Sequence, residues 1–351
     1  VPAGELEVGV KLGLQFGYWT AQPRTDLILL AQEAERLGFD SIWTGESYSS
    51  DAFTPLAWVG AHTERITLAT GIAQLSARTP ASMAMHAMTL DALTAGRFKL
   101  GIGVSGPQVV EGWYGQPFDR PLQRTREAIE IIRQVLRREE PVEAPGPMHP
   151  MPLPADAPGS WGLGKPLKLI THPLRSDVPI LLGAEGPKNV ALAAELCDGW
   201  LPLYYSPSRP EIYGDVTGHL PDEFEIAVNV SVNICDDVVA GLLPQKAVLA
   251  FYIGGMGAKS RNFHTELMAR MGYESEARRI QELFLDGKRN EAIAAVPDAF
   301  ADEISLVGPI ERIRERLAAW RASPVTTIII GASDPATMLS LIHISEPTRL
   351  Q

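Results

Sequence analysis

The sequence has little cysteine, and its histidines are scattered. It holds 2 cysteines in 351 residues, Cys197 and Cys235, which lie far apart in apolar stretches. A disulfide framework or a cysteine-based metal site is therefore disfavoured, and two buried thiols are the simplest interpretation. The 7 histidines lack the tight spacing of metal ligands, so we expect no metal site.

Basic charge and long apolar runs are also lacking. With 31 Lys and Arg against 42 Asp and Glu, the formal net charge of −11 leaves no basic face for nucleic-acid phosphates. No uninterrupted apolar run approaches the ~20 residues of a membrane span. Residues 1–7 have neither the basic nor the apolar segment of a secretory signal. We expect a soluble, cytoplasmic protein without nucleic-acid or membrane partners.

What is present is a repeated succession of amphipathic helix, turn residue and short apolar strand. The helix predicted over 24–37 ends at Gly38, which suits the left-handed position after a helix. The other helices are predicted at 54–63, 80–94, 121–138, 187–197 and 308–322. The strands are predicted at 11–16, 41–45, 66–73, 98–104, 178–183, 199–203, 225–234 and 325–331. Continuously apolar strands are typical of a helix-covered parallel sheet, and this βα repeat favours a (β/α)₈ TIM barrel over a doubly wound sheet.

Three segments, 107–120, 139–177 and 238–305, interrupt the repeat. We assign them as insertions after strands 4 and 7 of a single barrel domain over 1–338, and expect the two long ones to form lids or walls over the barrel mouth. Residues 339–349 resemble a translated sequencing adapter, which predicts a non-native tail over 339–351. A genuine final helix ended by Pro347 is the alternative.

The carboxyl ends of the strands, where barrel enzymes have their active sites, are rich in aromatic residues. The aromatic residues that follow strands 1, 2, 4 and 6 are Tyr18, Trp19, Tyr48, Trp113, Tyr114, Tyr204 and Tyr205. They predict a concave site for a flat ligand, although packing of helices onto the sheet would also explain several of them. Glu46, at the end of strand 2, is the best-placed acid; a surface-loop carboxylate is the alternative.

Two glycine-rich turns follow strands. Gly101–Gly106 matches G-x-G-x-x-G, but no helix opens directly after it, so a Rossmann dinucleotide site is disfavoured. Glycines at that place would still let a planar ring approach the backbone. Gly183–Asn189 runs from a strand straight into a helix, where free backbone N–H groups and Lys188 would seat a phosphate. An ordinary βα turn is the alternative.

Several segments resemble the bacterial luciferase-like oxidoreductases, most closely the actinobacterial branch assigned to coenzyme F420, a 5-deazaflavin hydride carrier. The segments are Lys11–Trp19, Gln74–Pro80, Leu100–Gly106, Val110–Phe118 and Leu182–Pro202. The resemblance extends over nearly the whole chain before the suspected tail. It implies a (β/α)₈ barrel that binds coenzyme F420 and transfers a hydride to or from a small organic substrate, and it suggests a homodimer.

The resemblance also implies a site. Strand 3 would end in a bulge with a non-prolyl cis peptide at Gly71–Ile72, behind the deazaflavin ring. The implied cofactor-binding residues are Trp19, Glu46, Gly71, Ile72, Gln74, Gly103, Val104, Ser105, Gly183, Ala184, Glu185, Gly186, Pro187 and Lys188. Relatives often carry an acid followed by His at the end of strand 2, whereas this chain has Glu46–Ser47. The implied catalytic proton donor is then Glu46, Tyr114 or a group on the substrate.

Two alternatives remain at this point. One is a luciferase-like monooxygenase that uses flavin mononucleotide (FMN) on the same barrel. The other is a non-catalytic protein that binds a deazaflavin or flavin, because the histidine after Glu46 is missing. A deazaflavin has carbon where a flavin has its reactive nitrogen and does not readily activate oxygen, so the first interpretation implies reduction or dehydrogenation.

Overall fold

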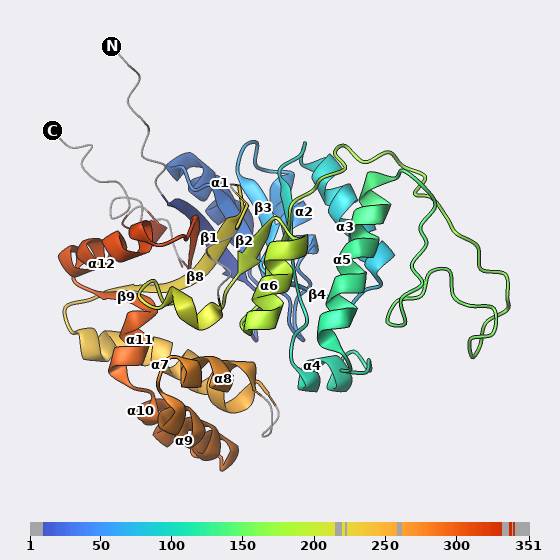
Figure 1. Cartoon of the computed structure of the whole chain (residues 1–351). Coiled ribbons are helices and arrows are strands. Elements are labelled where there is room, and N and C mark those ends of the chain that lie inside the picture. The colour runs from blue at the N-terminus through green and yellow to red at the C-terminus, as the bar shows by residue number, and fades with distance from the viewer. Residues whose placement is uncertain are drawn as a thin grey trace.

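A computed structural model describes residues 10–214, 220–221, 223–257, 262–331, 337–338 and 340. Its centre is a parallel sheet whose strands follow one another around a barrel (Figure 1). The strands are β1 Lys11–Gly17, β2 Ser41–Thr44, β3 Thr67–Thr70, β4 Ala73–Gln74, β5 Phe98–Gly103, β6 Ile180–Gly183, β7 Gly199–Leu201, β8 Glu225–Ile234, β9 Ser305–Gly308 and β10 Thr327–Gly331. The suspected tail at 339–351 lies outside the described residues, except for Ser340.

The sheet closes because β10 pairs on both of its edges. Thr327 of β10 lies opposite Lys11 of β1 and also opposite Ala227 of β8, in parallel register. The residues packed together in the barrel interior are Trp43, Ala69, Leu181, Leu201, Ala227 and Ile329. Gly13 makes room for Trp43, since a Cβ at that position would lie 2.6 Å from the indole Nε1. The predicted (β/α)₈ barrel is therefore confirmed.

Helices cover the outside of the barrel and match the six predicted ones to within a few residues. They are α1 Leu27–Leu37, α2 Thr54–Gly60, α3 Pro80–Leu93, α5 Pro121–Arg137, α6 Pro187–Leu196 and α12 Ile310–Ala322. Gly38 ends α1 as expected: its φ is +86°, and its N–H donates to the carbonyls of Ala34 and Glu35. Helix α4, Pro107–Gly112, lies in the first predicted insertion and was not predicted as a helix.

The insertion at 238–305 lies at the carboxyl ends of the strands, as expected, and forms the lower part of Figure 1. It consists of α7 Val238–Gly255, α8 Phe263–Arg270, α9 Glu274–Leu285, α10 Arg289–Ala295 and α11 Asp298–Glu303. The strand β9 that follows was missed in the sequence, and it extends the sheet by pairing with residues 231–234 of β8.

Helix α7 is long and apolar enough to cross a membrane by length and composition alone. It is the one such helix in the part of the chain that the structure describes, which is weak evidence for a span. It packs against α9, α10 and α11, and its Lys246 is ion-paired with Asp298 at 2.6 Å. These contacts assign α7 to the folded domain.

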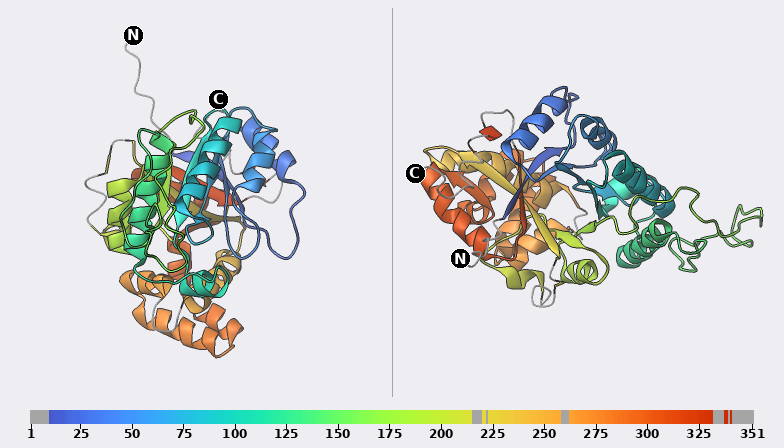
Figure 2. Two further views of the ribbon diagram at one scale, coloured as in Figure 1. Left: turned by 90° about the vertical axis from the view of Figure 1, so that its right-hand side faces the viewer. Right: turned by 90° about the horizontal axis from the view of Figure 1, so that it is seen from above.

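The expectation that the insertion at 139–177 forms a wall of the mouth is wrong, because none of its residues lines the mouth cavity described below. The insertion joins the end of α5 to the start of β6, and in a βα unit the helix returns the chain to the amino ends of the strands. Arg175 anchors it there by pairing with Asp91 of α3 at 2.7 Å. From there the chain runs back along α5, where the N–H groups of Met148 and His149 donate to Glu127. The rest projects sideways as a long arm, which the right-hand view of Figure 2 shows.

Both cysteines are free thiols. Cys197 is buried, and burial raises its pKa to about 12; Cys235 is partly buried. The expectation of two thiols without a disulfide is confirmed, with only one of them fully buried.

Candidate functional site

The carboxyl end of the third barrel strand carries the bulge that the resemblance implied. Ala69 pairs with Lys99, and the next pair in the adjoining strand is Ala73 with Ile102. The step from 69 to 73 is one residue longer than the step from 99 to 102, so Gly71–Ile72 contains an extra residue that separates β3 from β4. The expected cis peptide is wrong: Gly71–Ile72 is trans, and the cis bond among the described residues is Met151–Pro152.

Glu46 holds this bulge in place. Its backbone N–H donates to the carbonyl of Ile72 (3.1 Å), and its Oε2 accepts from the N–H of Gln74 (2.8 Å). The guanidinium of Arg78 donates to both carboxylate oxygens, at 2.7 and 2.8 Å. The Glu46 side chain is 3% exposed. Glu46 is therefore a buried, ion-paired carboxylate, and the surface-loop alternative is wrong.

Three of the expected cofactor residues meet in a floor beneath the mouth. The Ile72 side chain lies against Gly103 and Gly183, where an added Cβ would come within 2.1 and 3.2 Å of it. Gly103 pairs with Gln74, and Val104 and Ser105 follow directly. Glycine at 103 and 183 lets the Ile72 side chain settle onto the backbone of two neighbouring strands. The result is a smooth apolar surface at the carboxyl ends of β4, β5 and β6.

The turn from β6 into α6 has the form that the sequence predicted. Gly186 is the N-cap of α6, Pro187 occupies its first turn, and Lys188 is exposed. A Cβ built on Gly186 would meet nothing within 4 Å. The backbone at this helix end is therefore accessible to a ligand of negative charge.

Helix α8 adds two residues to this turn that sequence reasoning missed. Arg270 donates to the carbonyl of Glu185 (2.8 Å), and its buried Nε has no hydrogen-bond partner among the described residues. Nδ1 of His264 lies 2.8 Å from the Glu185 carboxylate. No local signal marks these residues, because only the packing of the 238–305 insertion onto the β6 turn brings them there. Glu185 thus contacts protein on both its backbone and its side chain.

A cavity of about 270 Å³ opens at the mouth, where its lining residue Ser47 follows Glu46, the residue whose N–H donates to the Ile72 carbonyl. It lies between the loops after β1 and β2 and the end of α7, and is lined by Tyr18, Trp19, Thr20, Ser47, Tyr48, Ser49, Phe251 and Met256. Three of these side chains, Tyr18, Trp19 and Tyr48, belong to the predicted aromatic rim. These lining side chains are aromatic, hydroxylic or apolar, so this part of the site is suited to an uncharged ligand surface.

The other rim residues divide between the mouth and the core. The Trp113 ring lies 6.3 Å from that of Tyr48, which extends the rim. Tyr114 is half-buried, and its pKa is raised, first by burial and then by the negative charge of Glu46, against the opposing charge of Arg78. Tyr205 instead stacks on Tyr213 with ring centroids 5.2 Å apart, so its assignment to the rim is wrong.

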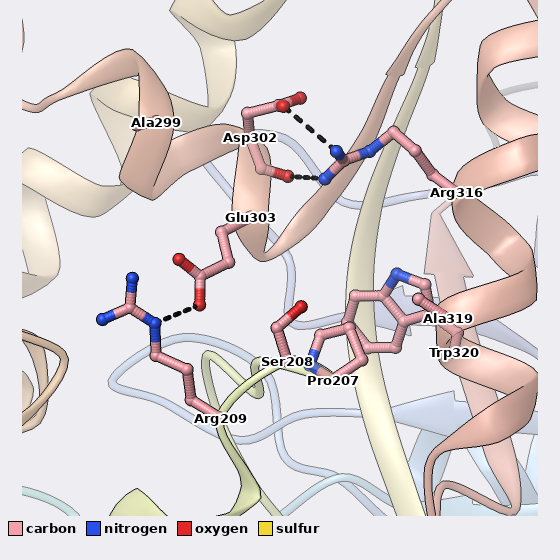
Figure 3. Close-up of a pocket in the computed structure, with 9 residues that line it drawn as sticks. All are labelled: Pro207, Ser208, Arg209, Ala299, Asp302, Glu303, Arg316, Ala319 and Trp320. Atoms are coloured by element: carbon pink, nitrogen blue, oxygen red, sulfur yellow. Dashed lines mark hydrogen bonds and ion pairs between the residues drawn. The ribbon is translucent and has the colours of Figure 1, made fainter.

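A second cavity, of about 330 Å³, lies outside the barrel between the loop after β7 and helices α11 and α12 (Figure 3). Its charged side chains pair with one another: Arg209 with Glu303 at 2.9 Å and Arg316 with Asp302 at 3.2 Å. None of the sequence-predicted site residues lines it. The mouth cavity and the floor beside it therefore make the better candidate site.

Comparison with known proteins shows the family of the chain. The model of the luciferase-like monooxygenase family matches residues 7–327. The chain belongs to this family. It is 50% identical over 336 residues to a Mycobacterium tuberculosis protein named "putative coenzyme F420-dependent oxidoreductase", covering 93% of this chain and 96% of that protein.

Solved structures share the fold. The coenzyme F420-dependent tetrahydromethanopterin reductase of Methanopyrus kandleri superposes with a TM-score of 0.76 at 22% identity, covering 95% of this chain and 97% of that one. An F420-dependent secondary alcohol dehydrogenase in complex with an F420–acetone adduct gives a TM-score of 0.66 at 18% identity, covering 96% and 98% of the two chains. At these identities the likeness extends to the fold alone.

Proposed function

We propose that this protein is an oxidoreductase that binds coenzyme F420 and transfers a hydride between it and a small, uncharged organic substrate. The observation that carries the proposal is the floor of Ile72, Gly103 and Gly183 beside an aromatic mouth, in a chain half identical to a relative named for this cofactor. A deazaflavin supplies a hydride at C5 of its central ring.

The residues present suit both ends of such a cofactor. The apolar floor offers a flat surface to a ring, and Trp19 lines the mouth cavity. The open backbone at Gly186, the exposed Lys188 and the unpartnered Nε of Arg270 suit a phosphate and further negative charge. We assign to cofactor binding the fourteen residues that the resemblance implied, with Glu46 acting through the bulge that it holds rather than by contact, and we add Arg270.

Each catalytic candidate has a distinct part in this proposal. The Glu46 carboxylate accepts hydrogen bonds from the Arg78 guanidinium and the Gln74 N–H, so it acts as an acceptor. We therefore assign Glu46 the positioning of the bulge rather than the donation of a proton. Tyr114, in the field of the same ion pair, contacts the substrate from the α4 side. The Tyr48 and Trp113 rings and the end of α7 limit the access of water to the floor.

Titration of the purified protein with coenzyme F420 and, separately, with FMN tests the proposal. We expect saturable quenching of F420 fluorescence and at least tenfold weaker binding of FMN. Tight FMN binding without F420 binding would instead favour the alternative of an FMN-dependent monooxygenase, the activity for which the family is named. Bound reduced F420 that no enone, imine, ketone or quinone ever oxidises would favour the non-catalytic carrier.

A further inference from the structure

Tyr204 holds a backbone conformation that its surroundings must enforce. It follows β7 with a φ of +91°, a left-handed value that costs a non-glycine residue on the order of 1–3 kcal/mol. The Tyr213 hydroxyl donates to the Tyr204 carbonyl (2.8 Å) and accepts from the N–H of Ser206 (3.0 Å). Tyr213 is itself fully buried. The fold therefore fixes the direction in which the Tyr204 side chain leaves the strand end.

That direction is toward the mouth. The Tyr204 ring meets Tyr252 of α7 and His264 of α8 edge-on, with centroids 6.1 and 6.0 Å away. Tyr252 shares a side-chain hydrogen bond with Tyr18, which lines the mouth cavity. The next residue, Tyr205, turns the other way and packs between Tyr213 and Trp320. Tyr204 is thus the phenol after β7 that faces the mouth, with Tyr252 between it and the cavity residue Tyr18.

The Tyr204 hydroxyl is buried and unsatisfied. The residue is 8% exposed, and its hydroxyl has no hydrogen-bond partner among the described residues. A buried hydroxyl without a partner costs roughly 1–3 kcal/mol, so a partner that arrives with the ligand would recover that free energy. Burial, followed by the charges of Tyr252, Glu185 and Tyr18, raises its pKa well above the usual range. The group therefore stays protonated, and it gives up its proton only to a stronger base, such as the alkoxide or amide nitrogen that hydride transfer creates on a substrate.

We infer that the Tyr204 hydroxyl donates the proton that accompanies hydride transfer, an inference that rests on the proposed function. A reduced deazaflavin on the floor would supply the hydride to the carbon of a C=O or C=N bond. The O–H bond of Tyr204 breaks as a new O–H or N–H bond forms on the substrate heteroatom. The phenolate regains a proton from water after the product leaves, and the proton that accompanies loss of a hydride from the cofactor ring would pass to water. Tyr204 then serves as the proton donor in place of the histidine that relatives often carry at the position of Ser47.

A spectroscopic test asks whether the ligand reaches Tyr204, independently of turnover. We would place 3-fluorotyrosine at position 204 alone, or at position 205 alone as the matched control, and add oxidised F420 under conditions where its fluorescence confirms binding. The ¹⁹F signal of position 204 should shift and that of position 205 should stay. A stationary signal at 204 in protein with bound F420 would overturn the inference, whereas failure of F420 to bind would count against the proposed function itself.

A kinetic test isolates the proton. Tyr204→Phe keeps the ring contacts and should fold normally, with an unchanged Kd for F420. With the best-reduced ketone or imine of the panel we expect kcat to fall about 100-fold while KM changes less than threefold, since general acids typically contribute 10²–10⁴ in rate. The solvent isotope effect on kcat should rise. Tyr205→Phe should leave all three constants unchanged. Equal kcat in Tyr204→Phe and the native protein would assign the proton to another group.

Discussion

At the scale of single residues, Glu46 links two parts of the candidate site. Its position at the end of β2 is readable from the sequence, but its partner Arg78 is not, because the two residues are far apart in the chain. In the structure Glu46, which the sequence predicted as a catalytic acid, instead holds the bulge at Gly71–Ile72 in place. A carboxylate that already accepts three hydrogen bonds has little acceptor capacity left for a substrate.

Replacing Glu46 should therefore act on stability as well as on turnover. Glu46→Gln keeps the shape but leaves the guanidinium of Arg78, 13% exposed, without its counter-charge. We expect the free energy of unfolding to fall by about 3 kcal/mol, as for other broken buried ion pairs. Turnover should slow because the bulge loosens, while F420 binding is retained. Urea denaturation and steady-state kinetics measure the two effects.

The matched control for that change is Glu33→Gln. Glu33 pairs with Arg36 on the surface, where the Arg36 side chain is 66% exposed, so its loss should cost less than about 1 kcal/mol. If Glu46→Gln is no more destabilising than this control, the ion pair with Arg78 does not anchor the site. Unchanged turnover in Glu46→Gln would remove Glu46 from the mechanism altogether.

At the scale of elements, the turn between β6 and α6 tests the phosphate seat. Gly186 has an ordinary φ of −81° and open space around it, so alanine fits there without strain. We expect Gly186→Ala to keep the melting temperature within about 2 °C, since a change at an N-cap costs a few tenths of a kcal/mol to about 1 kcal/mol. The added methyl group stands where a phosphate would approach the helix end. F420 should therefore bind about tenfold more weakly, as read by fluorescence titration.

Gly112→Ala serves as the comparison. An added Cβ there also meets nothing within 4 Å, but Gly112 ends α4, away from the β6 turn. It should change neither stability nor F420 affinity. Equal affinity in the Gly186→Ala and Gly112→Ala variants would mean that the phosphate does not sit at the α6 terminus, and the βα turn would then be an ordinary one.

The elements themselves were largely predictable from the sequence because each βα unit carries its own signals. A run such as 225–234 is apolar enough to be recognised alone, and Gly38 marks a helix end by its backbone freedom. Strand β9 was missed because its 4 residues follow α11 without a turn residue between them. The contacts of Glu46 with Arg78 and of Glu185 with His264 depend on tertiary packing, which local pattern does not encode.

At the scale of the whole molecule, the order of elements decides which insertions reach the site. Segments 107–120 and 238–305 follow strands and so lie at the mouth, whereas 139–177 follows a helix and begins and ends at the opposite end of the barrel. The sequence contained this part of the information, because position after a strand or after a helix fixes the end at which an insertion begins. It did not reveal that Met148 and His149 run back along α5 to bond Glu127. The acidic balance of the chain has a related consequence: a net charge of −11 repels an anionic cofactor at long range, so Lys188, Arg270 and the α6 terminus must attract it locally.

The arm provides the last prediction. The tip of the arm carries large exposed side chains, Trp161 at 90% and Leu163 at 80%. At its base the two chain segments lie side by side, since a Cβ built on Gly164 would lie 3.3 Å from the carbonyl oxygen of Leu153. Residues 154–163 can therefore be replaced by two glycines without moving the base. Because no residue of the arm lines the mouth cavity, F420 affinity and turnover should stay within twofold, and the melting temperature within about 2 °C.

A mouth variant and a mass measurement complete that experiment. Trp113→Ala, which removes a ring 6.3 Å from Tyr48, should weaken substrate binding where the shortened arm does not. Light scattering should give the mass of the proposed homodimer for both the full and the shortened chain, since the arm tip is assigned no part in the site. If shortening the arm halves the mass and lowers F420 affinity together, the arm of one subunit completes the mouth of another, and the assignment of the site to a single chain is wrong.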